Sequence, residues 1–261
     1  MRVTCIQMEV LLAKPDRNFA HAAQLIRQAM EDKPDVVVLP EAWNTSFFPR
    51  ENMDALCDAD GKRVKEEIGA LAREFSVNIV AGSVSNLRGG KLYNTAMVFD
   101  RSGVCIASYD KTHLFSPMGE DKRVTPGDHL CRFTMDGVIC GLIICYDIRF
   151  PELVRSLTVP GLDMLFVVSQ WPQSRTAHLL SLTTARAIEN QMFVVGCNAP
   201  VTPGKAICGG NSAIVDPWGQ TLAQAGEYEE RITAECDLNI LQEIRGSIPV
   251  FRDRRPDLYR I

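Results

Sequence analysis

Apolar and polar positions follow two different periods along this chain, and together they predict strands and helices in alternation. Short apolar runs such as Val36–Leu39, 141–144 and 164–168 are typical of strands that are covered on both faces. Over 18–30 the apolar residues recur with the helical period, which predicts an amphipathic helix. Asp16 stands just before this stripe, so we expect it to be the N-cap.

The same two patterns predict the remaining elements and the fold class. A short helix is expected to begin near Pro151, because proline suits the first helical turn, and Asp136-Gly137 is a two-residue hairpin signal. Hairpins among the buried runs predict mixed sheets, so the fold class is α/β with two sheets packed face to face. Further strands are expected over 3–8, 79–81, 92–99, 104–108, 132–135, 138–145, 193–197, 212–215, 221–223 and 232–236, and further helices over 61–75 and 177–190.

The chain contains no low-complexity linker and no internal repeat of short period. We therefore expect a single domain over 1–261, in which 246–261 forms an extended C-terminal tail rich in charge and proline.

Composition excludes several classes of partner. The formal net charge of -4 argues against nucleic acid, since phosphate binding requires clustered lysine and arginine. No apolar run approaches the roughly 18 residues of a membrane helix, so no membrane partner is expected. Residues 1–8 are too short and too polar for a secretory signal, and we expect a cytoplasmic protein.

The nine cysteines and four histidines are scattered. The chain has no C-x-x-C pair and no histidines at i, i+4, so we expect neither a metal site nor disulfides. Taken singly, each cysteine is expected to be a small buried apolar residue.

Three apolar strands end abruptly in residues that can carry acid, base or nucleophilic chemistry. They end at Glu41, at Lys111 and at Cys145. Ligands of α/β proteins bind beyond the ends of strands, so these three ends are where a site is expected.

A cysteine nucleophile has requirements that the other two residues meet. The thiolate reacts, and a free thiol with a pKa of ~8.5 is only slightly ionised at neutral pH. Glu41 can take the thiol proton, and Lys111 can stabilise the charge that develops on the attacked carbonyl oxygen. The N–H of Tyr146 is a candidate second donor to that oxygen, in the geometry of a nucleophile elbow.

Three ordered blocks, Leu39–Glu41, Tyr109–Phe115 and Cys145–Glu152, resemble the signature blocks of the nitrilase superfamily of carbon–nitrogen hydrolases. The resemblance implies a four-layer α-β-β-α sandwich that assembles into homodimers or larger oligomers and needs no metal or organic cofactor. Further segments extend it over nearly the whole chain: 184–191, 216–219 and 250–259.

The resemblance also implies roles for individual residues. Glu41 matches the general base of the family, Lys111 its oxyanion-stabilising lysine and Cys145 its nucleophile. The family carries a second glutamate between the lysine and cysteine blocks, and Glu120 is the candidate here. The reaction that follows is hydrolysis of a small-molecule amide through an acyl-enzyme.

Residues that select the substrate are harder to assign. Trp171 either walls the pocket or packs in the core or at a subunit contact, and Arg149 either binds a substrate carboxylate or pairs with an acid structurally. Phe47 and Phe48 either line the pocket mouth or simply pack.

The residues of segments 144–152 and 170–172 resemble the corresponding motifs of omega-amidases, which act on 2-oxoglutaramate or 2-oxosuccinamate. Within the superfamily the alternatives are an N-carbamoyl amino acid hydrolase, a deaminated-glutathione amidase and a nitrilase. An inactive scaffold or partner-binding protein is the alternative from another class.

Overall fold

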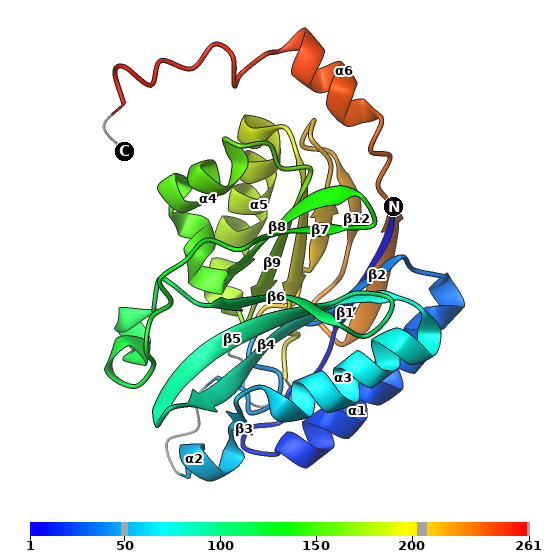
Figure 1. The fold of residues 1–261 in the computed structure, drawn as a ribbon, viewed down its shortest axis with the longest axis vertical. Helices are drawn as coiled ribbons and strands as arrows, with labels where there is room; N and C mark the ends of the chain where they lie inside the picture. The colour runs from blue at the N-terminus through cyan, green and yellow to red at the C-terminus, as the bar shows by residue number, and fades with distance from the viewer. Residues whose placement is uncertain (48–51, 203–207, 260–261) are drawn as a thin grey trace.

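The structure, a computed structural model, describes residues 1–47, 52–202 and 208–259. Two β-sheets lie face to face, and helices cover the outer face of each sheet (Figure 1). Helices α1 (Pro15–Ala29) and α3 (Lys62–Phe75) cover the first sheet, and α4 (Pro151–Thr158) and α5 (Thr176–Asn190) cover the second. The expected four-layer α-β-β-α sandwich is confirmed.

Both sheets are mixed, as the hairpin signals predicted. The first has the order β13-β1-β2-β4-β5-β6, with β3 paired to β4, and the second has the order β12-β11-β10-β9-β8-β7. The strands of the first sheet are β1 (Arg2–Gln7), β2 (Val36–Val38), β3 (Asp58–Ala59), β4 (Asn78–Arg88), β5 (Lys91–Phe99), β6 (Cys105–Asp110) and β13 (Glu230–Glu235). Those of the second are β7 (Arg132–Met135), β8 (Val138–Ile144), β9 (Met164–Ser169), β10 (Phe193–Asn198), β11 (Ala213–Val215) and β12 (Thr221–Gln224).

Strand directions bring the polar strand ends together. Strands β1, β2 and β4 run parallel to one another, and so do β8, β9 and β10. Because β5 is antiparallel to both β4 and β6, strand β6 points the same way as β2. The residues after β2 and β6 therefore leave the first sheet at one edge, and these residues include Glu41 and Lys111.

The buried run at β2 shows why some strands are apolar on both faces. Val36 and Val38 pack between the two sheets, whereas Val37 and Leu39 pack against α1 and α3. All four side chains are fully buried. Burial of each of these side chains stabilises the fold by ~1.5–3 kcal/mol. A strand with polar residues at every second position would lose the apolar contacts on one of its two faces.

Asp16 is not the N-cap of the first helix, so that prediction is wrong. The helix begins at Pro15, its N-cap is Lys14, and no side chain caps it. Proline fits this first position because its fixed φ and missing N–H cost nothing there. Asp16 lies in the first helical turn instead and forms an ion pair with Arg63 at 2.6 Å.

Several elements are longer than the sequence predicts, and others were not predicted at all. Strand β4 extends from Asn78 through Arg88, well beyond the expected 79–81, because its buried polar side chains carry no apolar pattern. Helix α6 (Ile240–Ser247) runs past 246, so the irregular tail begins at Ile248. The other additions are short: α2 (Met53–Leu56), β3 (Asp58–Ala59) and the 3₁₀ helices η1 (Met30–Asp32), η2 (Ser116–Met118), η3 (Glu120–Lys122), η4 (Cys145–Arg149) and η5 (Gln173–Arg175).

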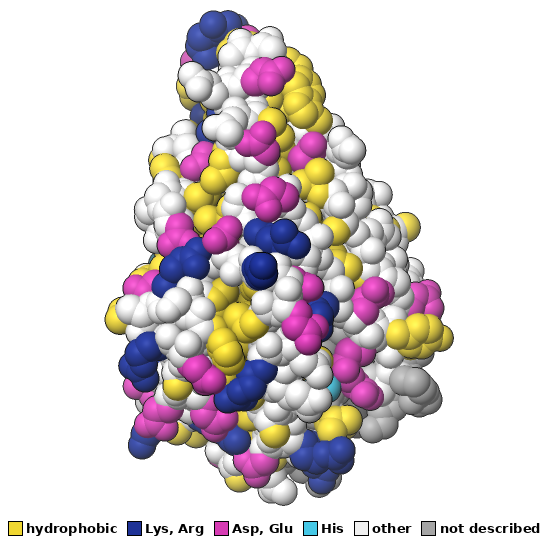
Figure 2. All heavy atoms as spheres, turned by 90° about the vertical axis from the view of Figure 1, so that its right-hand side faces the viewer, with side chains coloured by type: hydrophobic (Ala, Val, Ile, Leu, Met, Phe, Trp, Pro, Cys, Tyr) yellow, Lys and Arg dark blue, Asp and Glu magenta, His cyan; other side chains and the backbone are white. Residues whose placement is uncertain are grey.

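The surface in Figure 2 intermixes basic and acidic side chains, so this face presents no basic patch of the kind that binds phosphates. Within the described residues, no helix combines the length and the apolar character that crossing a membrane requires.

Candidate active site

Cys145 stands at the point where β8 ends and the chain turns sharply. Its φ is +50°, in the left-handed region that residues other than glycine rarely adopt. Such a backbone conformation costs ~1–3 kcal/mol and is characteristic of functional sites. The five-residue 3₁₀ helix η4 follows, and α4 begins only at Pro151, so the thiol lies at a tight elbow and not directly at the start of an α-helix.

Asp147 fastens this elbow to the loop after β6. Its Oδ2 accepts hydrogen bonds from the Ile144 N–H (3.0 Å) and the Tyr109 hydroxyl (2.8 Å). Its Oδ1 accepts from the Thr112 hydroxyl (3.1 Å) and the His113 N–H (3.0 Å), and it lies 2.8 Å from His113 Nδ1. The carboxylate is fully buried. It therefore holds the lysine and cysteine blocks together, a contact that the sequence prediction missed.

Lys111 is fully buried between two glutamates. Its Nζ lies 2.9 Å from Glu41 Oε1 and 2.9 and 3.1 Å from the two oxygens of Glu120. Burial alone would lower the pKa of Lys111, but the charge of Glu41, with smaller contributions from Cys145 and Glu120, holds it above its ordinary value. Lys111 is therefore a permanent cation.

Donors from three segments fix the carboxylate of Glu41. Oε1 accepts from Lys111 and from Asn94 Nδ2 (2.9 Å), and Oε2 accepts from the Gln170 N–H (2.8 Å). Pro40 cannot donate to the sheet, so β2 ends before Glu41 and the chain turns toward the second sheet. There the Glu41 N–H donates to the Ser169 carbonyl at 3.4 Å. The carboxylate is thus held between the sheets with little rotational freedom.

Glu120 also belongs to this cluster, as its sequence position predicted. It is buried, whereas the next three residues of its charge run are exposed. The Phe115 N–H donates to its Oε2 at 2.6 Å, and Asn94 Nδ2 lies 3.4 Å from its Oε1. Burial raises the pKa of Glu120; Lys111 opposes that rise, and the nearby charge of Glu41 adds to it.

Asn94, on β5, links the two carboxylates and was not predicted from the sequence. Its Nδ2 is shared between Glu41 and Glu120, and its backbone carbonyl accepts the Lys111 N–H at 2.9 Å. Its own Oδ1 is buried and has no hydrogen-bond partner among the described residues. Asn94 therefore contacts both acids through its side chain, and through its backbone carbonyl it holds the backbone of Lys111, whose ammonium lies between them.

The thiol of Cys145 is neutral at rest. Burial raises its pKa well above the ordinary value, and the charge of Glu41 raises it further, while Lys111 acts in the opposite direction. The reactive thiolate must therefore form as the proton leaves, and Glu41, the carboxylate whose charge acts most strongly on the thiol, is the candidate acceptor.

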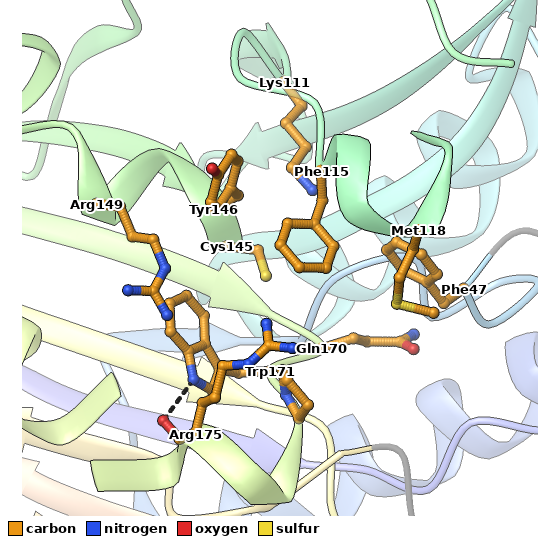
Figure 3. Close-up of a pocket in the computed structure, with 11 residues that line it drawn as sticks. Phe47, Lys111, Phe115, Met118, Cys145, Tyr146, Arg149, Gln170, Trp171 and Arg175 are labelled. Atoms are coloured by element: carbon orange, nitrogen blue, oxygen red, sulfur yellow. Dashed lines mark hydrogen bonds between the residues drawn. The ribbon is translucent and has the colours of Figure 1, made fainter. Parts of the chain in front are cut away.

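A cavity opens in front of the sulfur (Figure 3). Its space, open solvent at the mouth included, is about 540 Å³. Glu41 and Glu120 lie behind Lys111 and do not line it. The lining residues are Phe47, Lys111, Phe115, Met118, Cys145, Tyr146, Arg149, Gln170, Trp171, Pro172 and Arg175.

Six of these residues were predicted from the sequence. Their contacts bear on the alternative roles that the sequence left open for Trp171, Arg149 and Phe47. Trp171 both packs and walls the cavity: it is almost fully buried, and its Nε1 donates to the Arg175 carbonyl at 2.7 Å. Arg149 stacks over the Trp171 ring at 4.6 Å, and no carboxylate lies within 4.0 Å of it in the described ranges. Phe47 lines the cavity, whereas Phe48 lies outside the described residues.

Tyr146 follows the nucleophile, and its ring packs edge-on against Phe115 and Phe150 at 5.0 and 5.1 Å. The lining residues that sequence reasoning missed are Phe115, Met118, Gln170, Pro172 and Arg175. Phe115 and Gln170 stand inside the quoted blocks, but Met118 and Arg175 come from short 3₁₀ turns that carry no pattern. Across the described residues, no group of three or more histidine, cysteine or acidic side chains is arranged to hold a metal ion.

Comparison with known proteins places this site in a family. Residues 2–246 match the family described as Carbon-nitrogen hydrolase. The chain is 41% identical over 257 residues to the 2-oxoglutaramate amidase of Bacillus subtilis (strain 168), covering 98% of each chain. It is 34% identical over 270 residues to the omega-amidase NIT2 of Homo sapiens, covering 100% of this chain and 97% of that one.

Among solved structures, Saccharomyces cerevisiae Nit3, a member of branch 10 of the nitrilase superfamily, superposes with a TM-score of 0.89 at 28% identity, over 98% of this chain and 96% of that one. With the family match spanning nearly its whole length, this chain belongs to the carbon–nitrogen hydrolases and is an amidase that cleaves the carbon–nitrogen bond of an amide.

Proposed function

We propose that the chain is an omega-amidase, which releases ammonia from the terminal amide of a small 2-oxo acid such as 2-oxoglutaramate or 2-oxosuccinamate. The observation that carries the proposal is a cavity with two chemically different ends. We call the part around Cys145 and Lys111 one end and the facing part, which carries the guanidinium groups of Arg149 and Arg175, the other; the guanidinium of Arg175 reaches toward the Cys145 sulfur. An amide and a carboxylate on one short chain match these two ends, and the names of the relatives support the same substrate class.

In the proposed mechanism Glu41 takes the proton of the Cys145 thiol as the sulfur attacks the amide carbon. Lys111 Nζ and the N–H of Tyr146 stabilise the oxyanion of the tetrahedral intermediate. The intermediate collapses to a thioester when Glu41 returns the proton to the nitrogen, which leaves as ammonia. Glu41 then deprotonates a water, which attacks the thioester and releases the acid and the thiol.

The buried cluster suits these proton transfers. Lys111 keeps its charge throughout and can respond to the new oxyanion without a proton transfer of its own. Glu120 holds Lys111 with both oxygens, and we propose that it positions the lysine and takes no proton from the substrate. Low local polarity makes each of these charge interactions stronger than in water.

The apolar walls of the cavity suit the methylene groups between the two ends. Phe47, Phe115 and Trp171 form part of these walls, and they also limit the access of water to the thioester. We propose that Trp171 and Phe47 contact the acyl chain and that the basic end binds its carboxylate.

A substrate panel that measures ammonia release tests the proposal. We expect turnover of 2-oxoglutaramate and 2-oxosuccinamate to exceed that of N-carbamoyl amino acids, deaminated glutathione and simple nitriles by at least ~100-fold in kcat/KM. Turnover of carbamoyl compounds or nitriles with none of any omega-amide would overturn it. Cys145→Ala should abolish activity, whereas Cys57→Ala, which removes a half-buried cysteine between α2 and β3, should retain it.

We further propose that residues 1–261 act as one cytoplasmic domain whose C-terminal tail takes part in a homodimer or larger assembly. Large apolar side chains that are exposed by 44% to 65% support this, namely Val159, Ile188, Trp218, Ile248, Leu258 and Tyr259 on the second-sheet helices, the β11–β12 turn and the tail. Light scattering after size exclusion tests it: a monomeric full-length chain whose mass is unchanged by truncation after Ser247 would reject the assembly.

A further inference from the structure

The two arginines at the cavity differ in how fully their guanidinium groups are engaged. That of Arg149 stacks over the Trp171 ring at 4.6 Å, and its Nη2 lies 3.2 Å from His178 Nδ1. That of Arg175 lies 5.5 Å from the Phe115 ring, and no carboxylate is within 4.0 Å of it in the described part of the chain. In Figure 3 it reaches into the space in front of the Cys145 sulfur, whereas Arg149 lies beside Trp171.

The backbone of Arg175 is held firmly although its side chain has few polar partners. Its N–H donates to the Pro172 carbonyl at 3.0 Å, and its own carbonyl accepts the Trp171 Nε1–H at 2.7 Å. Trp171 is itself fixed by Asn198, whose Oδ1 accepts the Trp171 N–H at 2.7 Å. Rigid backbone support with an unpaired terminal group is the arrangement expected of a residue that binds a ligand.

The catalytic end of the cavity cannot supply a cation for a substrate carboxylate. Lys111 is matched by Glu41 and Glu120, so the cluster carries no net positive charge. A dianionic or monoanionic substrate is therefore directed with its carboxylate away from this cluster and toward a guanidinium. Between aromatic walls that exclude water, a two-pronged arginine–carboxylate pair is strong.

We propose that Arg175 binds the carboxylate of the substrate and sets the preference for acidic amides, whereas Arg149 chiefly holds Trp171 in place. The inference rests on the proposed function, since it requires a substrate with an amide at one end and a carboxylate at the other. It assigns substrate selection to a residue of the η5 turn and not to the arginine that follows the nucleophile in the same sequence block.

The test compares kcat/KM for 2-oxoglutaramate with that for pentanamide, a neutral amide of the same chain length, in the wild type, Arg175→Gln, Arg175→Lys and Arg149→Gln. Arg175→Gln should lower kcat/KM for 2-oxoglutaramate about 10- to 100-fold, mainly through KM, because the pair lost is charged. The kcat/KM for pentanamide should fall by less than about 5-fold in the same variant, so the ratio of the two kcat/KM values falls sharply. Arg175→Lys should recover part of the ratio, since it keeps the charge without the planar fork.

Arg149→Gln serves as the matched control, because it removes the same charge from the same cavity. This variant should lower kcat/KM for both substrates by a similar factor, because Trp171 is displaced. Inhibition of pentanamide turnover by glutarate gives a second readout, and its inhibition constant should rise at least 10-fold in Arg175→Gln.

The outcomes separate this inference from the proposed function. If the wild type prefers 2-oxoglutaramate and Arg175→Gln keeps that preference, the inference is overturned while the omega-amidase function stands. If the collapse of the ratio occurs in Arg149→Gln instead, the two roles are exchanged and the inference is wrong. If the wild type turns over no omega-amide, the proposed function itself fails.

Discussion

The two ends of the cavity are built on different physical principles. At the catalytic end, Glu41, Lys111 and Glu120 are fully or almost fully buried, and each of their charged groups has several hydrogen-bond partners. At the other end, Arg149 and Arg175 are half-buried, and their surroundings are mostly aromatic. A buried cluster with many hydrogen bonds fixes one reaction, whereas a basic end with few polar contacts can change its substrate through few substitutions.

The largest effect should come from removing the base while keeping its shape. Glu41→Gln is expected to lower kcat by ~10³-fold or more, because no other group can take the thiol proton. The same change should lower the pKa of Cys145, since the charge of Glu41 helps to raise it. Alkylation of Cys145 by iodoacetamide at pH 8 should therefore become faster while turnover is lost, as followed by mass spectrometry of the Cys145 peptide.

Glu67→Gln, the same substitution at an exposed glutamate of α3, should change neither kcat nor the rate of Cys145 alkylation. Slower alkylation in Glu41→Gln would contradict the electrostatic coupling between the acid and the sulfur.

The next effect concerns the carboxylate that joins the lysine and cysteine blocks. Asp147→Asn should lower the free energy of unfolding by about 3 kcal/mol, because an amide cannot accept all the hydrogen bonds that Asp147 now accepts. Urea denaturation measures this loss, and kcat should fall with little change in KM as the elbow shifts. The same substitution at an exposed position, Asp121→Asn, is the control. An unaltered urea midpoint in Asp147→Asn would show that the network contributes nothing to stability.

A smaller, pH-dependent effect is expected from Glu120. Because the fold holds the pKa of Glu120 above its ordinary value of 4.5, protonation of this group favours the folded state. Its stabilising contribution is present below about pH 4.5 and is lost as the pH rises through the raised value. Glu120→Gln mimics the protonated form, so the wild type should lose stability relative to this variant between pH 5 and pH 8, as measured by urea midpoints. The opposite sign of this difference would mean that Lys111 outweighs burial at Glu120.

The smallest effect is expected at the substrate end. Trp171→Phe removes the Nε1–H that donates to the Arg175 carbonyl but keeps an aromatic wall. The loss of one hydrogen bond is worth ~1 kcal/mol, so KM for 2-oxoglutaramate should rise about 5-fold while kcat changes less than 2-fold. Steady-state kinetics on 2-oxoglutaramate and pentanamide measure both constants. A fall in kcat that exceeds the rise in KM would place Trp171 with the catalytic end instead.

The same contrast explains what the sequence could predict. Glu41, Lys111 and Cys145 follow apolar strands, so periodicity alone marks the positions where they leave the sheets, and the family resemblance adds Glu120. Asn94 lies within β5 among buried residues, where nothing in the local pattern distinguishes a polar contact to the site from any other buried polar group.

Other residues were missed because their contacts cross between the sheets or depend on short turns. Asp147 offered a signal, an acid two residues after the nucleophile in a turn that needs N–H acceptors, but its four partner residues are set by tertiary structure. Arg175 projects from a 3₁₀ turn of three residues, a length at which periodicity carries no information.

The left-handed backbone at Cys145 has a consequence for how this protein could lose its activity. Glycine adopts that conformation without penalty, so Cys145→Gly is expected to resist urea better than Cys145→Ala, although a shorter side chain usually weakens a fold. Selection for thermal robustness alone would therefore discard the cysteine. The nucleophile at this position therefore costs stability that the same scaffold would have with glycine, a trade-off between stability and activity located in a single backbone torsion.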